Sequence, residues 1–323
     1  MKRAQIVVAM AVALIGCGGP PPPTQSARPP TEMVTPSITS SPTSVPAPSQ
    51  LSTVPPAPQL PANAYIDPDG EVVFTGDMAV FTLGATAGSP AVDIPISAAT
   101  VDFGDGTTAA VDGSCTPGGS PQKVAHIYQS SGHFTARVSS AQLCEPGRGL
   151  DFSESRQVLI LPSAPSSTRD WPTCTTFQIR MTGTGQGAAL GNVGALFRLQ
   201  NRSSVGCTLD GYPGIRLVSP TGVILHSDVH EAIDGDYLFP AIPSHRVALE
   251  PGSFAAFALG YGDNPFGPGE NEPYDVACPT ARWVRIVLPQ THQFGTASLA
   301  ISPCEGRMNV SPIFPGADWI SFQ

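Results

Sequence analysis

Hydrophobic and polar residues alternate one by one in many short runs from Tyr65 to the carboxyl-terminal end of the chain. This period of two is typical of β-strands that have one buried and one exposed face. Gly, Pro and Asp separate the runs and favour turns, and no run shows a convincing amphipathic-helix pattern. The sequence therefore predicts an all-β fold of sandwiches. Three runs show the pattern clearly: Phe134, Ala136 and Val138; Ala195, Phe197 and Leu199; and Val284, Ile286 and Leu288.

The first sixteen residues have a different pattern. Lys2 and Arg3 precede an uncharged apolar run from Ile6 to Ile15, which is too short to cross a bilayer as a helix. A basic start followed by an apolar stretch is typical of an export signal. The run ends in Leu-Ile-Gly-Cys17, which resembles the lipobox of bacterial lipoproteins.

The lipobox resemblance implies that the leader is cut before Cys17 and that the Cys17 sulfur carries a diacylglycerol. It further implies acylation of the new amino terminus, for example by palmitate. Two or three acyl chains hold a protein firmly on a membrane, whereas one is marginal. The alternatives are a chance cysteine in an ordinary signal or a short anchor helix.

Composition divides the rest of the chain. Between Gly18 and Asn63, 14 of 46 residues are proline and 13 are serine or threonine, a composition that favours an extended, disordered stalk. A second Pro/Ser-rich patch near residue 165 reads as a linker. We therefore expect a signal peptide at residues 1–16, a lipidated stalk at 17–63, a β-sandwich at 64–162, a linker at 163–170 and a second β-sandwich at 171–323.

The charge balance excludes some partners. The formal net charge is −9 for the whole chain and becomes −11 once Lys2 and Arg3 leave with the signal. A chain this acidic lacks the basic face that nucleic acids need and the polybasic patch that would hold anionic lipid. We therefore expect no nucleic acid partner, and no later run is long enough for a membrane-spanning helix.

Six cysteines remain after Cys17, an even number that suits an exported, disulfide-bonded protein. They allow fifteen connectivities, and no C-x-x-C spacing suggests a zinc or redox site. Their division between the two sandwiches favours three bridges, with free buried thiols as the alternative. The expected pairs are Cys115–Cys144, Cys174–Cys207 and Cys278–Cys304.

A motif in the first sandwich resembles the PKD family of Ig-like surface modules. It consists of a Val-Asp-Phe-Gly-Asp-Gly strand and turn and a later His-x-Tyr followed by an alternating strand. Val101 stands where the family has Trp, and the link between the two halves is enlarged. The matching residues are Asp102, Phe103, Gly104, Asp105, Gly106, His126, Tyr128, Gly132 and Phe134.

The second sandwich resembles a widespread actinobacterial secreted domain of unknown function. The resemblance implies a disulfide-bonded β-sandwich at the cell envelope, with no activity to transfer. We expect Asn201 and Ser203 to form a hairpin turn. The matching residues are Asn201, Ser203, Cys207, Thr208, Leu209, Gly211, Tyr212, Pro213, Leu249, Pro251 and Gly252.

Three motifs could suggest chemistry. The first, Gly183-x-Gly-x-x-Ala188, follows a strand expected at Phe177–Met181, but no helix or acidic residue follows as a dinucleotide site needs. The second, His226 to Glu231, reads as a loop, whereas a metalloprotease needs His-Glu-x-x-His on a helix. The aspartates at 67, 69, 102 and 105 lack the spacing of a calcium loop. We expect no enzyme activity, no metal and no cofactor.

The candidate contact surface is a Gly/Pro-rich loop over residues 260–274 that holds Tyr261, Phe266 and Tyr274 beside three acidic groups. Long loops on rigid sandwiches often bind partners, and aromatic side chains anchor them. The expected function is a non-catalytic binding or adhesion module for envelope glycan or protein. It would sit on the extracytoplasmic face of a bacterial cell membrane, held by its lipid anchor. The alternatives are an accessory carrier or sensor for a small ligand or metal, and a cell-envelope hydrolase.

Overall fold

The fold is seen in a computed structural model that describes residues 62–89, 91–113, 115, 121–145, 147–264 and 278–318. These residues form strands, turns and two short 3-10 helices, without an α-helix among them. The all-β, sandwich-like fold that the alternation predicts is confirmed. The expected signal and lipobox, and the expected stalk up to residue 61, lie outside the described residues. The predicted end of the stalk at residue 63 is two residues too late, because Ala62 and Asn63 already belong to the first strand, Ala62–Pro68.

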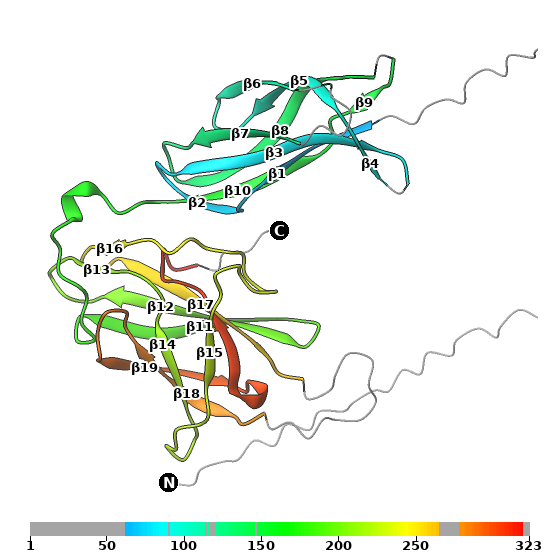
Figure 1. The fold of residues 1–323 in the computed structure, drawn as a ribbon. Helices are drawn as coiled ribbons and strands as arrows, with labels where there is room; N and C mark the ends of the chain where they lie inside the picture. The colour runs from blue at the N-terminus through cyan, green and yellow to red at the C-terminus, as the bar shows by residue number, and fades with distance from the viewer. Residues whose placement is uncertain are drawn as a thin grey trace, which may run out of the picture. The chain divides into compact units, whose positions relative to one another are not determined.

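The first sandwich has two sheets (Figure 1). One sheet has the order β4-β3-β1-β9 with β7 paired to β3, and the other has the order β2-β10-β8-β5-β6. The strands are β1 (Ala62–Pro68), β2 (Val72–Phe74), β3 (Met78–Ala87), β4 (Val92–Ile94), β5 (Ile96–Asp102), β6 (Thr108–Asp112), β7 (Gln122–Ile127), β8 (Gly132–Leu143), β9 (Leu150–Asp151) and β10 (Ser155–Leu161).

Alternation along these strands builds the core of the first sandwich. On β3, Ala79, Phe81, Leu83 and Ala85 are buried. Val80 and Thr82, which lie between the first three of them, are partly exposed. On β8, Ala136 and Val138 face the same core, as the sequence predicts. Burial of apolar surface at about 25 cal/mol per Å² is the main force that holds the two sheets together.

The second sandwich contains three sheets, with the orders β11-β12-β17-β20-β15, β13-β16 and β14-β18-β19. A short strand, β21, pairs with β17. The strands are β11 (Ile179–Ala189), β12 (Asn192–Asn201), β13 (Cys207–Leu209), β14 (Gly214–Val218), β15 (Asp228–Glu231), β16 (Val247–Leu249), β17 (Phe254–Gly262), β18 (Ala281–Val287), β19 (Phe294–Ile301), β20 (Arg307–Val310) and β21 (Phe314–Pro315).

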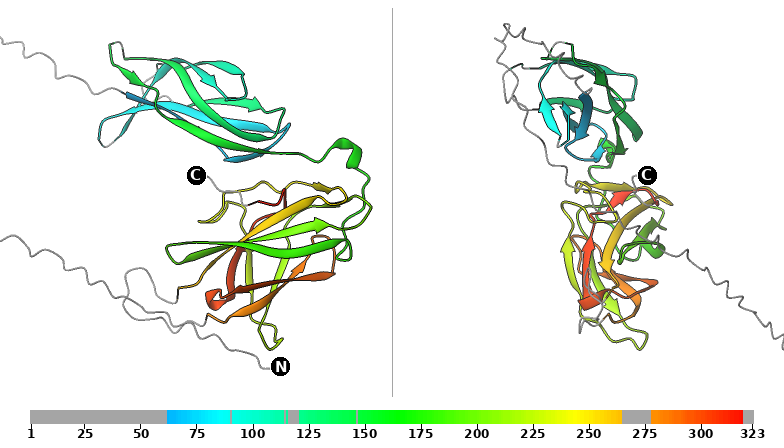
Figure 2. Two further views of the ribbon diagram at one scale, coloured as in Figure 1. Left: turned by 180° about the vertical axis from the view of Figure 1, so that it is seen from behind. Right: turned by 90° about the vertical axis from the view of Figure 1, so that its right-hand side faces the viewer.

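The second core lies between these sheets. The rings of Phe197 on β12 and Phe257 on β17 stack 5.0 Å apart and are fully buried. Val284 and Ile286 on β18 pack against the same cluster, as their alternation predicts. Figure 2 shows the layer of β14, β18 and β19 against the layer of β11, β12 and β17.

A further apolar cluster joins residues from the two halves of the unit Ala57–Gln323. It contains Phe74 and Leu161 from the first sandwich and Leu196, Ala256 and Phe314 from the second, among others. The segment expected to be a linker contains the 3-10 helix η1 (Ser166–Thr168). Arg246 donates hydrogen bonds to the carbonyl groups of Thr168 and Arg169, which ties this segment to the second sandwich.

The structure joins the six described cysteines in the same three pairs that the sequence favours. The bridges are Cys115–Cys144, Cys174–Cys207 and Cys278–Cys304; a second 3-10 helix, η2 (Cys304–Gly306), starts at the last of them. Three disulfides indicate an extracellular or otherwise oxidising location. In the part of the chain that the structure describes, no helix has the length and apolar composition needed to cross a membrane.

Three local predictions are wrong. Residues Asp228 to Glu231 form strand β15 instead of a loop, because they pair in parallel with β20, about 80 residues later. The turn at Asn201 and Ser203 leads from β12 to β13, which belong to different sheets, so it is not a hairpin turn. Strand β11 begins at Ile179, and Phe177, expected inside the strand, is 93% exposed in the turn before it.

Candidate functional site

The Val-Asp-Phe-Gly-Asp-Gly motif of the first sandwich, residues 101–106, builds a hydrogen-bonded turn between β5 and β6. The Asp102 carboxylate accepts a hydrogen bond from the Gly104 backbone N–H and two from the Arg137 guanidinium. Asp105 accepts from the Thr107 hydroxyl and from His126 Nε2, the latter at 2.7 Å. Both carboxylates therefore hold the turn and join it to the neighbouring strands β7 and β8.

These contacts favour the charged form of both carboxylates. The Gly104 N–H and then Arg137 hold the pKa of Asp102 below its ordinary value. Burial on its own raises the pKa of Asp105, but the hydrogen bonds from Thr107 and His126 outweigh it and lower that pKa overall. A carboxyl group whose pKa is lower in the folded state adds stability that is complete above its unfolded pKa of about 4 and lost as pH falls below it.

We therefore expect the first sandwich to lose unfolding free energy as pH falls from about 5 to 2. Asp102→Asn, which cannot ionise, should lose less of its own stability over that range than the wild-type chain. Urea unfolding at pH 7 and pH 3 measures the loss of unfolding free energy in the wild-type chain and in the Asp102→Asn variant. Equal losses in the two proteins would show that Asp102 does not contribute to the acid sensitivity.

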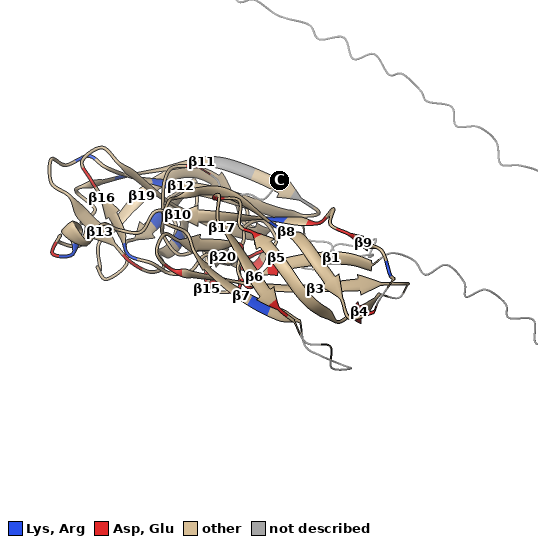
Figure 3. Cartoon of the chain, turned by 90° about the horizontal axis from the view of Figure 1, so that it is seen from above, with Lys and Arg blue, Asp and Glu red and all other residues tan. Residues whose placement is uncertain are grey.

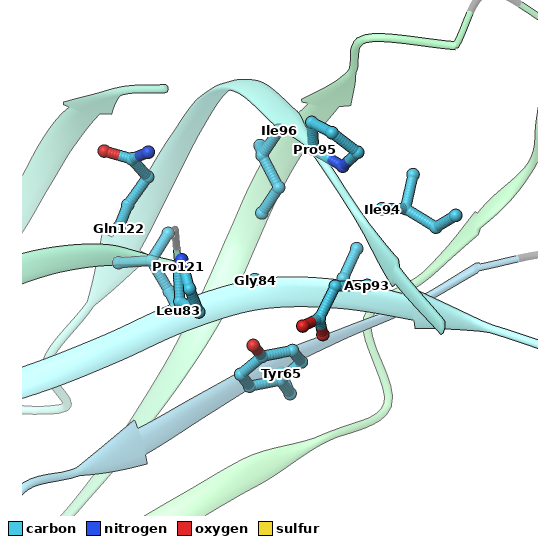
Figure 4. Close-up of a pocket in the computed structure, with 10 residues that line it drawn as sticks. Tyr65, Leu83, Gly84, Asp93, Ile94, Pro95, Ile96, Pro121 and Gln122 are labelled. Atoms are coloured by element: carbon cyan, nitrogen blue, oxygen red, sulfur yellow. The ribbon is translucent and has the colours of Figure 1, made fainter. Parts of the chain in front are cut away.

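A small hollow lies between β3, β4 and the start of β7. The Tyr65 ring covers Gly84 on the neighbouring strand, and a Cβ at Gly84 would be 2.5 Å from the Tyr65 hydroxyl oxygen. Figure 4 shows the ring beside Gly84 with the Asp93 carboxylate close by. Burial, Asp93 and Asp67 raise the pKa of Tyr65. The cavity volume is about 20 Å³, enough for a water molecule but not for a larger ligand.

A larger hollow of about 450 Å³ lies at one end of the second sandwich, beside the end of β17. Its lining comes from β11, β12, β17 and the end of β19. Burial and, secondarily, the Asp263 carboxylate raise the pKa of Tyr261 to about 12, although the Ser302 backbone group lowers it. The Tyr261 hydroxyl is therefore protonated at neutral pH. The lining residues are Gly187, Ala188, Val193, Tyr261, Asp263, Ala300, Ile301 and Ser302.

The glycine-rich run beside this hollow forms a β-hairpin. Strand β11 pairs with β12 through the two-residue turn Leu190-Gly191, so no helix follows the Gly183-x-Gly-x-x-Ala188 motif and the requirement of a dinucleotide site is not met. Leu190 and Gly191 both have positive φ, at 50° and 81°, as tight hairpin turns of this kind require. Leu190 is 88% exposed, so its strained backbone places an apolar side chain in solvent.

Leu190→Asn is expected to stabilise the second sandwich by about 1 kcal/mol, because Asn adopts positive φ more readily than Leu. The matched control is Leu190→Ala, which removes the exposed side chain but keeps a Cβ in the same strained conformation. Urea denaturation of the three proteins compares their unfolding free energies. An Asn variant no more stable than the Ala variant would contradict the turn assignment.

Of the three aromatic residues predicted to contact a partner, the structure describes Tyr261. Tyr261 lies on β17 and is 7% exposed, so its placement on an exposed loop is wrong; the alternation of Phe257, Leu259 and Tyr261 turns all three toward the core. Phe266 and Tyr274 lie outside the described residues, as does the lipidation candidate Cys17. Asp263 is one of the acidic groups of the predicted contact loop, whereas Ser302 was not predicted, because it lines the hollow from the end of β19 and no sequence motif marks it.

The histidines of the His226–Glu231 segment do not converge on a metal site. His230 Nε2 lies 3.2 Å from an Asp228 carboxylate oxygen, and both side chains are about half exposed. Among the described residues, no group of three or more His, Cys, Asp or Glu side chains could hold a metal ion.

Comparison with known proteins extends the description of the second sandwich. A family model for a domain of unknown function, DUF4232, matches residues 174–313. The match runs from Cys174, one partner of a disulfide, to Ile313, just before β21. No curated protein matches the chain.

Proposed function

We propose that this chain is a lipid-anchored, non-catalytic binding or adhesion module on the extracytoplasmic face of a bacterial cell membrane. In this proposal Cys17 carries the acyl chains, residues 17–63 are a stalk, and a PKD-like sandwich precedes the DUF4232-like one. Its ligand is glycan or protein of the envelope. The three disulfides support the exported location, and the Leu-Ile-Gly-Cys17 motif supports the anchor.

The hollow beside Tyr261 carries the non-catalytic part of the proposal. Asp263 is the one carboxylate among the described residues that line it. The hydroxyl of Tyr261, with its raised pKa, serves as a hydrogen-bond donor and is a poor general base at neutral pH. A hydrolase needs a nucleophile activated by a base, or an acid–base pair, within hydrogen-bond reach. The described lining offers one carboxylate, Asp263, and one serine, Ser302, whose hydroxyl bonds with the Thr280 hydroxyl.

The anchor is tested by fractionation of a bacterium that processes lipoproteins. The wild-type chain is expected in the membrane fraction, and Cys17→Ser is expected to leave it, because the serine oxygen does not receive the diacylglycerol. Mass spectrometry of the amino-terminal peptide measures the modification directly. An unmodified thiol on a cleaved chain, or an intact leader, would contradict the anchor.

The binding part is tested separately with the full-length chain and isolated envelope material. We expect the chain to sediment with the wall or surface-protein fraction after washing in detergent, which removes any contribution of the acyl chains. Failure to bind any envelope fraction would refute the binding proposal while leaving the anchor intact.

A further inference from the structure

The outer face of the sheet β14-β18-β19 carries an unusual set of side chains. The inner face holds Ile215, Leu217, Val284, Ile286 and Ala297, all of them in the core. Alternation therefore turns the intervening residues away from the core. These outward residues are Arg216 on β14, Trp283 and Arg285 on β18, and Phe294 on β19. Together with the exposed Arg282 next to Trp283, we call them the arginine face.

Two arginines on this face stand directly opposite each other. Arg216 on β14 pairs in register with Arg285 on β18. Directly opposite side chains of an antiparallel pair lie about 5 Å apart at Cβ, and like charges in such positions are destabilising. The protein thus has an unfavourable pair of like charges on the outer face of a sheet. Positions that break a rule of local stability in this way are often functional.

No acidic side chain neutralises these arginines within the described structure. None of the residues of β14, β18 or β19 is Asp or Glu. The ion pairs found among the described residues involve other cations and leave out Arg216, Arg282 and Arg285. The face is positive on a chain whose net charge is −9. In Figure 3, where Lys and Arg are blue and Asp and Glu red, charged residues cover a small part of the ribbon.

Aromatic rings accompany the guanidinium groups. The Arg285 guanidinium carbon lies 4.8 Å from the centre of the Phe294 ring, and that of Arg282 lies 5.2 Å from the Trp283 ring. Phe294 is 52% exposed. The register of β18 against β19 shifts between Ala281 and Trp283, and at this shift Arg282 is exposed next to the half-buried Trp283. Stacking on a ring holds a guanidinium in place while leaving its N–H groups free to donate.

We propose that the arginine face binds an anionic glycan. Its phosphate or carboxylate groups accept hydrogen bonds from Arg216 and Arg285, which suit both anions because the guanidinium donates two parallel N–H groups. Its sugar rings pack on Trp283 and Phe294. The anion also lies between the guanidinium groups of Arg216 and Arg285, so binding offsets the repulsion between these two like charges.

Charge and shape favour a glycan over other polyanions. Attraction to an anionic membrane usually takes a cluster of four to eight Lys or Arg, and this face has three arginines. Acidic peptides are also recognised by clusters of arginine, but here the rings of Trp283 and Phe294 lie beside the guanidinium groups and give sugar rings a surface to pack on. The inference deepens the proposed function, on which it rests, by naming a surface and a ligand chemistry.

The test uses the full-length chain, detergent-washed, with immobilised polygalacturonate and poly(glycerol phosphate), neutral dextran, and vesicles of phosphatidylglycerol. We expect both anionic polymers to bind and neutral dextran not to bind. Arg216→Gln with Arg285→Gln should weaken binding at least tenfold while leaving the chain as stable as the wild type or slightly more so. Phe294→Ser should weaken it less, since it removes a ring and keeps both charges.

The matched control is Arg180→Gln with Arg202→Gln, which makes the same change in net charge at two exposed arginines elsewhere in the second sandwich. This pair is expected to bind like the wild type. Equal weakening by both pairs, equal retention on neutral dextran, or binding to vesicles without binding to polymers would overturn the inference. Binding of the double variant to envelope material with wild-type affinity would also overturn it, yet would leave the proposed function standing.

Discussion

Replacing Cys174 and Cys207 together by alanine is expected to lower the unfolding free energy of the second sandwich by about 4 kcal/mol. The bridge closes a loop of 33 residues, for which the loss of loop-closure entropy in the unfolded chain is worth about 3.7 kcal/mol. Both cysteines are fully buried in the core, so the lost sulfur contacts add to that amount. Urea unfolding of the two proteins under oxidising conditions, followed by circular dichroism, measures the difference.

The matched control is the double alanine variant at Cys115 and Cys144. That bridge closes a similar loop, with a separation of 29 residues, but Cys115 is exposed, so few packing contacts are lost there. We expect a loss of about 3.5 kcal/mol from the entropy term, confined to the first sandwich. A loss below about 1 kcal/mol for the Cys174–Cys207 variant would contradict the structural role of the buried bridge.

Much of the fold was predictable because the signals are local. Alternation at Ala195, Phe197 and Leu199 requires one face to be buried, and the structure buries all three. The cysteine pairs could be favoured because the Pro/Ser-rich patch separates two of the cysteines from the other four. The Asp105-Gly106 turn follows from residue types alone, and it is held by the Asp105–Thr107 contact.

The parts that were missed depend on partners distant in sequence. The residues Asp228 to Glu231 have no local pattern that predicts a strand. They form one because they pair in parallel with β20, whose residues come about 80 positions later. Tyr261 was assigned to a loop because glycine and proline follow it, yet β17 continues through Gly262. The arginine face was missed because Arg216 and Arg285 are 69 positions apart and meet only through strand pairing.

The second large effect is expected at Tyr128 in the first sandwich. Its ring is 1% exposed and packs between His126, at 4.5 Å edge to face, and Phe134, at 4.8 Å. Its hydroxyl donates a hydrogen bond of 3.1 Å to the Phe103 carbonyl. Burial raises the pKa of Tyr128, with Asp105 and Asp102 adding to it, so the hydroxyl stays protonated and keeps donating. Tyr128→Ala should lower the unfolding free energy of the first sandwich by about 3–5 kcal/mol, because it leaves a cavity in the core.

Tyr128→Phe separates the ring from the hydroxyl. It keeps the ring packing and removes the hydrogen bond that the Tyr128 hydroxyl donates to the Phe103 carbonyl. The loss of this donor should lower the unfolding free energy by about 1–2 kcal/mol. Urea unfolding of the three proteins at pH 7 gives both differences, and the Cys174–Cys207 variant marks which transition belongs to the second sandwich. The ring then accounts for most of the loss, as expected for a residue that holds β5, β7 and β8 together. Equal costs for Ala and Phe would instead make the hydroxyl bond, and not the aromatic packing, the dominant contribution.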